Sequence, residues 1–406
     1  MSKPTLLWIS DNPHFCFVAQ SIVTRRVLAG LLDEYDVEVL GYYSPIMARQ
    51  SILDALPYNV HVVKRFDAEN TLAKIKDLNP DILIVSHDAF QFQYLPKVRQ
   101  MLPDTKIIGW FTIDGEPLPL LWQGILEACD LVVTPTEYGK RVLKESVFYL
   151  PVDVIPYGID HSLYYPRRDQ RKELVNELKQ LPPPLNVLLP PEKFYYIFWG
   201  HNQLKKNITA IVDAWKLMDL RDKAHVLLVL HSNPTQRGDW LFPGDWHWRA
   251  DAVPPGISIL DGTYLDPTMS RLVQYCDSLV FPSIGEGFGM PILEAMAAGL
   301  IPITTDYAGP TSFCTEENSL LVEGTLLVGD FNIRRKVISV EALAEAMQKV
   351  FDIREHSPER FDEMRANAIE TASKYTWERT VYEMKQAIER VTSSRYDRRW
   401  RTLQLG

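Results

Sequence analysis

Residues 286–294, Glu-Gly-Phe-Gly-Met-Pro-Ile-Leu-Glu, place two carboxylates eight positions apart around a Gly-Phe-Gly turn. The turn follows Ser278–Phe281, an apolar run that predicts a buried strand. It leads into Pro291–Ala298, which predicts a short helix closed by Gly299. Free N–H groups and the positive dipole end at a helix start attract anions. With Glu286 and Glu294 on either side, the segment predicts a ligand that carries phosphate and hydroxyl groups, such as a sugar nucleotide.

A second segment, Phe198–Asn207, joins a predicted strand to a predicted helix. Lys205 and Lys206 lie at this corner, at the same level of the predicted sheet as Glu286. A lysine at that position can neutralise a diphosphate as a point charge. The alternative is a solvated loop with two adjacent lysines, followed by Asn207 as an N-cap.

Polar residues also follow two predicted strands in the first half of the chain. Asp114 comes three residues after the strand Ile107–Phe111. His87 and Asp88 follow the strand Ile82–Ser86. Ligands of such folds bind beyond the carboxyl ends of the strands, so these three residues are candidates to face a cleft. The alternatives are an Asp-Gly turn at Asp114 and a packed or capping role for His87.

The two carboxylates of the first segment also have purely structural interpretations. Glu286 fits a solvated loop, and Glu294 fits a carboxylate that complements the dipole of its own helix. The aromatic segment Trp240–Trp248 fits either a sugar-stacking flap or a loop that packs on its own domain.

The composition is that of an ordinary globular protein, with 46% hydrophobic and 23% charged residues over 406 positions. That length favours two domains. The net charge of −9 disfavours non-specific binding to polyanions. We see no apolar run of about 18 residues, no signal-peptide pattern and no metal-binding spacing among the four scattered cysteines. These features predict a cytoplasmic protein with reduced cysteines and without a transmembrane segment.

Short β-branched runs alternate with helical stretches, which predicts an α/β fold with parallel sheets. Strands are predicted in the first half at Leu6–Ser10, Val37–Gly41, Val60–Val63, Ile82–Ser86, Ile107–Phe111 and Leu131–Thr134, and in the second half at Tyr195–Trp199, Val226–Leu230, Ile257–Leu260, Ser278–Phe281, Ile301–Thr304 and Ser319–Val322. Predicted helices include Ser21–Leu32, Leu72–Leu78, Ile208–Leu217, Pro267–Tyr275, Pro291–Ala298 and Val340–Asp352. We expect two doubly wound halves, residues 1–165 and 192–375, joined by a proline-rich linker at 166–191.

Together these segments resemble the GT-B glycosyltransferases, in particular the retaining family four with its "glycosyl transferases group 1" domain. Residues 286–294 resemble the family's E-x7-E pair. The other matching segments are 154–160 (V-x-P-N-G-V-D), 200–207 (the G-R-x4-K-G donor loop), 308–310 with 317–322 (the closing Gly-Gly and N-G-x-L-V stretches) and 375–378. In that fold two Rossmann-like domains face a cleft, and the last helix, here 376–406, crosses back to the first domain.

The resemblance implies a role for each residue of the donor half. Glu286 would lie beside the transferred sugar, and Glu294 would accept hydrogen bonds from the ribose. Lys206 would stabilise the leaving diphosphate. The backbone of Gly287, Phe288 and Gly289 would hold sugar hydroxyls and the distal phosphate, and Lys205, His201 and Asn202 would complete the donor site. The resemblance implies no metal and no cofactor, and the donor would be a UDP- or GDP-sugar.

Four features depart from the family pattern. His201 stands in place of the arginine of the donor loop, and Asp114 stands in place of the catalytic-loop histidine. The loop after the first strand lacks its glycines, and the glutamate of the G-G-x-x-E stretch after Gly309 is absent. We expect a retaining, metal-independent transferase, with Asp114 as a catalytic residue and with His87 and Asp88 on the acceptor side. The alternatives are a phosphorylase or epimerase with the same fold, or a non-catalytic nucleotide-sugar-binding protein. The hydroxyl acceptor stays open, and a nucleic acid is the less favoured acceptor.

Overall fold

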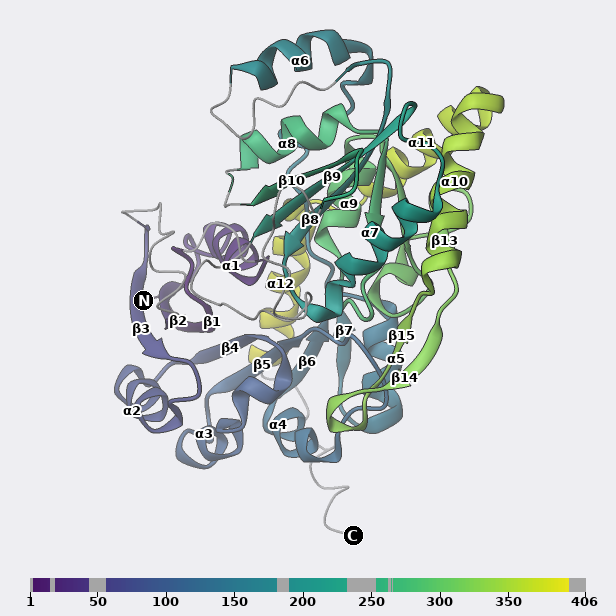
Figure 1. The fold of residues 1–406 in the computed structure, drawn as a ribbon. Helices are drawn as coiled ribbons and strands as arrows, with labels where there is room; N and C mark the ends of the chain where they lie inside the picture. The colour runs from purple at the N-terminus through teal and green to yellow at the C-terminus, as the bar shows by residue number, and fades with distance from the viewer. Residues whose placement is uncertain are drawn as a thin grey trace. The chain divides into compact units, whose positions relative to one another are not determined.

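The computed structural model describes residues 3–14, 19–43, 56–180, 190–231, 253–261, 264 and 266–393. The chain divides into two compact units (Figure 1). Unit 1 comprises Met1–Gly158, Gly329–Ile333 and Trp377–Gly406, and unit 2 comprises Ile159–Val328 and Arg334–Thr376. Cys16 and the aromatic segment Trp240–Trp248 lie outside the described residues.

Unit 1 is built on a seven-stranded parallel sheet with the order β3-β2-β1-β4-β5-β6-β7. Its strands are β1 (Thr5–Asp11), β2 (Asp36–Tyr43), β3 (Asn59–Lys64), β4 (Ile82–His87), β5 (Lys106–Phe111), β6 (Leu131–Thr134) and β7 (Val152–Val154). Its helices are α1 (Ala19–Ala29), α2 (Ala68–Leu78), α3 (Leu95–Met101), α4 (Gln123–Ala128), α5 (Glu137–Ser146) and α12 (Trp377–Thr392). Helices α2, α3 and α4 cover one face of the sheet, and α1 and α12 cover the other (Figure 1).

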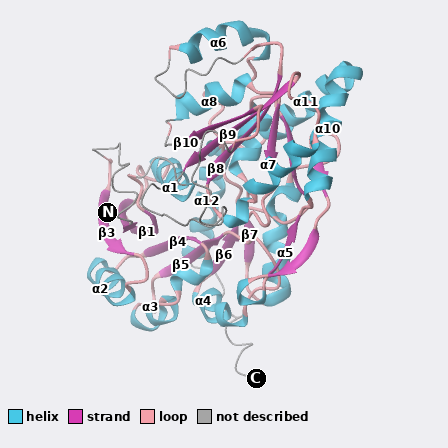
Figure 2. Cartoon of the chain, viewed as in Figure 1, coloured by secondary structure: helices cyan, strands magenta, loops and turns pink. Residues whose placement is uncertain are grey.

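Unit 2 is built on a six-stranded parallel sheet with the order β10-β9-β8-β11-β12-β13. Its strands are β8 (Phe194–His201), β9 (Ala224–His231), β10 (Ile257–Asp261), β11 (Ser278–Phe281), β12 (Ile301–Thr305) and β13 (Leu320–Val322), with an antiparallel hairpin of β14 (Thr325–Val328) and β15 (Arg334–Val337). Its helices are α6 (Arg171–Lys179), α7 (Ile208–Leu217), α8 (Asp266–Tyr275), α9 (Met290–Ala297), α10 (Val340–His356) and α11 (Pro358–Ser373). Figure 2 distinguishes these strands, helices and loops.

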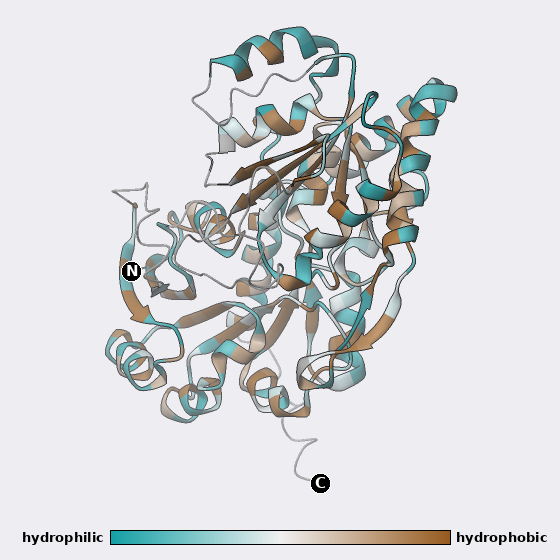
Figure 3. Cartoon of the chain, in the orientation of Figure 1, coloured by the Kyte–Doolittle hydropathy of each residue, from teal (hydrophilic) through white to brown (hydrophobic). Residues whose placement is uncertain are grey.

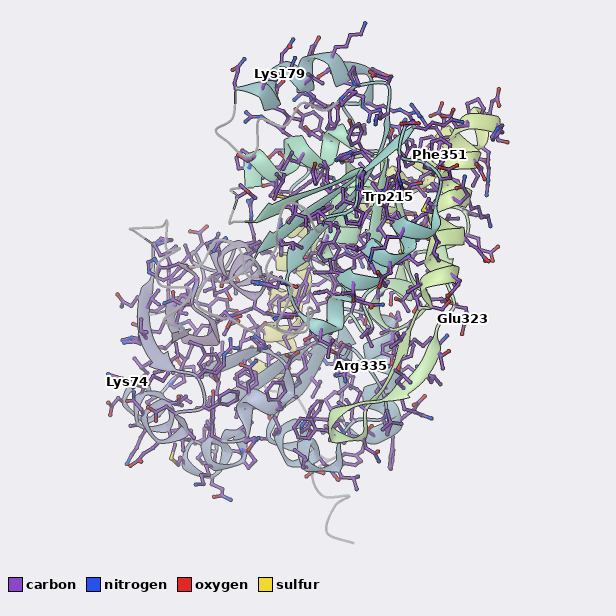
Figure 4. The ribbon with its side chains drawn as sticks, in the orientation of Figure 1. Lys74, Lys179, Trp215, Glu323, Arg335 and Phe351 are labelled. Carbon is purple, nitrogen blue, oxygen red and sulfur yellow. The ribbon has the colours of Figure 1, made fainter. Side chains whose placement is uncertain are left out.

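The predicted doubly wound α/β class is confirmed in both units. The central strands of each sheet are apolar along their length, because helices bury both faces (Figure 3). In unit 1 the Trp8 and Trp110 rings meet edge to face, 6.2 Å apart. In unit 2 the side chains of Trp215 on α7 and Phe351 on α10 are buried; both are labelled in Figure 4.

Several predicted elements differ from the observed ones. Helix α1 ends at Ala29, before the predicted Leu32, because the chain tightens into turns there: the N–H groups of Gly30 and Leu31 donate to carbonyls three residues earlier. The segment predicted as a linker contains α6, whose Leu174 and Leu178 are buried. The β14–β15 hairpin was not predicted, since its first strand is an exposed apolar run without alternation. Among the described residues, none of the helices is both long and apolar enough to cross a membrane.

Candidate functional site

The switch point of the unit 2 sheet lies between β8 and β11. From β8 the chain builds β9 and β10 on one side, then returns to place β11 on the other. Such a reversal leaves a crevice beyond the carboxyl ends of the two strands, where doubly wound folds bind ligands. Lys206 follows β8, and Glu286 follows β11, so the two residues lie on either side of this crevice.

Lys206 and Glu286 form an ion pair across the switch point. The Lys206 Nζ lies 2.5 Å from Glu286 Oε2, and it also lies 4.9 Å from the centre of the Phe281 ring. Ser283 Oγ donates a longer hydrogen bond of 3.4 Å to the same carboxylate oxygen. The side chains of Lys206 and Glu286 are 12% and 17% exposed, so the pair is largely removed from water but still open to a ligand.

The charge of Glu286 is set by this environment. Burial alone would raise the pKa of the carboxyl, but the positive charges of Lys206 and Lys205 lower it, together with the hydrogen bonds from Lys206 and Ser283. The net effect holds the pKa of Glu286 below its usual value. At neutral pH the site therefore presents a carboxylate and an ammonium side by side.

Glycines shape the backbone around Glu286. Gly289, the N-cap of α9, has φ 96°, a conformation that favours glycine over residues with a side chain. The Gly309 N–H donates to Glu286 O over 2.8 Å, and a Cβ on Gly309 would lie 2.7 Å from the carbonyl of Gly287. Ala308 has φ 57° and ψ −140°, which is costly for any residue but glycine. The close approach holds the turn against the 308–309 loop.

The other predicted donor residues have different surroundings. The Phe288 ring is buried against Phe313 and Tyr375, and the neighbouring Gly287 and Gly289 are buried as well. Glu294 is half-buried in the second turn of α9, and His201 is the last residue of β8. Of the predicted donor residues in the 200–207 loop, Lys205 is the exposed one. Its carbonyl accepts a 2.8 Å hydrogen bond from the Ile284 N–H.

Two asparagines near Lys206 keep buried polar atoms without a hydrogen-bond partner among the described residues. These atoms are Asn202 Oδ1 and Asn207 Nδ2. Such atoms are costly unless a ligand or water satisfies them. Asn207 occupies the predicted N-cap position of α7, with φ 53°, but its side chain makes no cap bond. The only feature of the sequence that linked Asn207 to the donor site was its position next to Lys206.

In unit 1, the predicted residues His87 and Asp88 belong to a polar cluster that also contains Asp11 and Arg65, which the sequence analysis missed. His87 Nε2 lies 3.2 Å from Asp11 Oδ2, and its Nδ1 lies 3.5 Å from Asp88 Oδ2. Arg65 pairs with the other oxygen of Asp11. Asp114 lies three residues beyond the end of β5 and is half-buried.

The charges of this cluster support one another. Burial alone would lower the pKa of His87, but Asp11 and Asp88 raise it to about 9. Burial alone would raise the pKa of Asp11, but His87 and Arg65 hold it below the usual value. The Asp88 backbone N–H also points at His87 Nδ1 over 2.7 Å, which suits the neutral ring. Gln91 Nε2 lies 2.6 Å from the same nitrogen, but turning this amide over brings its unpartnered Oε1 to the ring as an acceptor. We assign the charged ring at pH 7, because the two carboxylates and this amide oxygen outweigh one backbone N–H in a buried site.

Within the described ranges, His, Cys, Asp and Glu side chains form no group of three or more that could hold a metal ion. Cys129, Cys276 and Cys314 are buried free thiols. The structure thus brings Lys206, Glu286 and the 308–309 loop together in unit 2, and it brings His87 and Asp88 together with Asp11 and Arg65 in unit 1.

Comparison with known proteins points to the same half of the chain. Residues 193–352 match the family model described as glycosyl transferases group 1. The D-inositol 3-phosphate glycosyltransferase of Jonesia denitrificans is 24% identical over 248 residues, which are 59% of this chain and 51% of that protein. The O-antigen chain mannosyltransferase B of Escherichia coli is 28% identical over 106 residues, 26% of this chain and 27% of that protein. The chain thus spans about half or less of the curated relatives that it matches.

Solved structures show the same fold. The sucrose-phosphate synthase of Thermosynechococcus elongatus superposes with a TM-score of 0.73 at 19% identity, covering 95% of this chain and 98% of that one. Anabaena HepE in complex with UDP-glucose superposes with a TM-score of 0.70 at 12% identity, covering 95% and 99%. These likenesses confirm the predicted fold of two Rossmann-like domains.

Proposed function

Because residues 193–352 match the family model of the glycosyl transferases group 1, we propose that the chain is a glycosyltransferase. It transfers a sugar from a nucleotide-diphosphate sugar to an acceptor hydroxyl. The observation that carries the proposal is the Lys206–Glu286 pair, which lies beside a glycine turn and the N-terminus of α9 at the switch point of the unit 2 sheet. A cation, a carboxylate and the positive end of a helix dipole together suit a ligand with both phosphate and hydroxyl groups.

We assign the donor to unit 2. The diphosphate takes the place of Glu286 as the partner of Lys206, and the exposed Lys205 adds a second positive charge. The orphan amide atoms of Asn202 and Asn207 supply further hydrogen bonds to the donor. Glu294, one turn further along α9 from the cradle, accepts from the ribose hydroxyls. A UDP-sugar is the first choice among donors, since the HepE structure of the same fold is a complex with UDP-glucose.

The chemistry follows from charge development. As the glycosidic bond breaks, negative charge grows on the leaving diphosphate, and Lys206 with the α9 N-terminus is already in place to stabilise it. These groups supply positive charge without a metal, so we propose a metal-independent reaction. Glu286, freed from Lys206, accepts hydrogen bonds from the hydroxyls of the transferred sugar. The retaining outcome is proposed from the family resemblance.

The acceptor belongs to unit 1 in this proposal, with Asp114, His87 and Asp88 on the acceptor side. Boundaries near residues 165, 192 and 375 and a cytoplasmic location stay predictions.

A thermal-shift screen of the purified chain against UDP-, GDP- and ADP-sugars tests the proposal. A ligand that binds the native state alone raises the melting temperature, by an amount that grows with its concentration. We expect a shift with a UDP- or GDP-sugar and nucleoside diphosphate release when acceptors are added. The absence of a shift with all three donor classes would overturn the proposal.

A further inference from the structure

The polar cluster of unit 1 occupies the same topological position as the Lys206–Glu286 pair occupies in unit 2. The order of its sheet reverses between β1 and β4, and Asp11 ends β1 while His87 ends β4 (Figure 1). Their 3.2 Å contact therefore spans the switch point, where ligands bind in doubly wound folds. We call Arg65, Asp11, His87 and Asp88 the edge cluster.

Arg65 reaches this point from the end of the edge strand β3, two strands away from β1. It follows β3, and its guanidinium passes over the Tyr42 ring of β2, 5.7 Å from the ring centre, to pair with Asp11 of β1. Asp11 is 3% exposed and fixes one side of the guanidinium, while the Arg65 side chain stays 36% exposed. The guanidinium carries five N–H donors, so the exposed part is a prepared site for an anion.

Phe66, the next residue, is strained and exposed. Its φ of 66° is an outlier for a bulky side chain, and its ring is 68% exposed while stacked 6.3 Å from Phe90. Strain of this kind persists where the surrounding structure holds it and gathers at ligand sites. The turn that carries Arg65 thus also presents an exposed aromatic residue.

We propose that the edge cluster and Phe66 bind an acceptor that carries a phosphate group on a polyol or sugar ring. This inference rests on the proposed transfer function and names the chemical class of its acceptor. Arg65 holds the phosphate as a charge-assisted, bidentate partner. Phe66 covers one face of the ring, and Asp88, whose side chain is 40% exposed, accepts from a hydroxyl.

The geometry matches a ligand of that size. Arg65 contacts Asp11 at the end of β1, and Asp88 follows the neighbouring strand β4. Strands lie about 5 Å apart, so an anion on Arg65 and a hydroxyl on Asp88 are separated by roughly one to two strand spacings. A hexose phosphate covers that span.

Asp11 is a positioning residue in this arrangement. Its carboxylate is divided between Arg65 and His87, which places both cations at the edge of the sheet and leaves little of its own surface for a ligand. The exposed carboxylate of the cluster, Asp88, gains a hydrogen bond from Thr112 Oγ1 over 2.7 Å. The cluster therefore presents a cation and a hydroxyl acceptor as separate groups, which suits a phosphorylated polyol better than a bare anion.

The test measures binding of D-glucose 6-phosphate, D-glucose and phosphatidylinositol vesicles to the full chain by calorimetry or flotation. Arg65→Gln is the test variant. Arg379→Gln is the matched control, because Arg379 is a 47% exposed arginine of unit 1 that pairs with Glu383 on α12. UDP and GDP are titrated into each protein as the donor arm.

We expect D-glucose 6-phosphate or the vesicles to bind the wild type, and D-glucose to bind it more weakly. Arg65→Gln should bind the phosphate-bearing ligand with at least tenfold lower affinity, and Arg379→Gln should bind it with wild-type affinity. Binding of the vesicles alone, with the same dependence on Arg65, supports a lipid headgroup as the source of the phosphate. Equal binding by Arg65→Gln, or no binding of either phosphate probe, overturns the inference. If UDP or GDP still binds Arg65→Gln, the donor proposal stands even where the acceptor inference fails. If neither nucleotide binds the wild type, the proposed function itself fails.

A second variant separates a ligand role from a structural one. Phe66→Gly removes the strain at φ 66° and the exposed ring together. We expect an unchanged or higher melting temperature with at least threefold weaker binding of the phosphate ligand that the wild type prefers. Wild-type affinity in Phe66→Gly would remove Phe66 from the site.

Discussion

Replacing Lys206 with methionine isolates the electrostatic design of the donor site. The change keeps much of the length and volume of the side chain but leaves the Glu286 carboxylate without its 2.5 Å partner. Both side chains are less than one-fifth exposed, so water replaces the lost ammonium only in part. Removing one partner of a buried ion pair costs about 3–5 kcal/mol. Ser283 and Lys205 remain near the carboxylate, so we expect the lower end of this range, about 3 kcal/mol at pH 7.5.

The stability difference between the wild type and Lys206→Met should become smaller as the pH falls. In the wild type the folded pKa of Glu286 is lowered, so its contribution to stability is present above its unfolded value of 4.5 and is lost as the pH falls through the folded pKa. In Lys206→Met the largest effect left is burial, which raises the pKa. The carboxyl of the variant then takes up a proton on acidification and its penalty disappears. The difference between the two proteins should shrink from about 3 kcal/mol at pH 7.5 to below about 1 kcal/mol near pH 4.5.

The assay is urea-induced unfolding at both pH values. The double variant Lys206→Met with Glu286→Gln completes a cycle, and it should be more stable than Lys206→Met alone at pH 7.5 because the orphan charge is gone. Lys216→Met is the control, since Lys216 of α7 is 44% exposed and pairs with an exposed Asp213. Wild-type stability of Lys206→Met at pH 7.5, or a deficit that stays constant down to pH 4.5, would refute the reasoning.

Three further predictions concern the loops and the edge cluster. Ala308→Gly should raise the unfolding free energy by about 1 kcal/mol, measured by urea, because relief at φ 57° exceeds the entropy cost of glycine. Gly309→Ala should lower the melting temperature and weaken nucleotide binding, since its Cβ would lie 2.7 Å from the backbone at Glu286 and Gly287; wild-type values for both would contradict this. With a folded pKa of about 9, His87 adds stability that is full below pH 6.5 and lost as the pH rises through 9. The wild type should therefore lose up to about 3 kcal/mol more than His87→Asn between pH 6.5 and 9.5, and parallel losses would count against the charged ring.

The sheets were the predictable part of the fold. The predicted ranges Leu131–Thr134, Ser278–Phe281 and Ile208–Leu217 coincide with β6, β11 and α7. Strands buried on both faces are short apolar runs bounded by polar turns, and these are visible without tertiary information. The β14–β15 hairpin escaped prediction because its exposed Thr-Leu-Leu-Val strand shows neither a buried run between helices nor alternation.

The sequence predicted site residues only where they follow the end of a predicted strand. Lys206 and Glu286 are 80 residues apart, and the sequence indicates that both lie at the carboxyl edge of one sheet but not that they pair directly. Asp11 and Arg65 are 54 residues apart, and their contact depends on the strand order β3-β2-β1, which no local pattern encodes. The unpartnered Oδ1 of Asn202 likewise depends on burial created by distant segments.

The most direct test of the central claim is the dissociation constant of UDP and GDP, measured by isothermal titration for the wild type, Lys206→Met, Glu286→Gln and the control Lys216→Met. If the switch point of the unit 2 sheet is the donor site, one nucleotide binds the wild type and Lys216→Met equally, and Lys206→Met binds it at least tenfold more weakly. Glu286→Gln should keep most of the nucleotide affinity, since its role is with the sugar. Wild-type affinity in Lys206→Met would contradict the account.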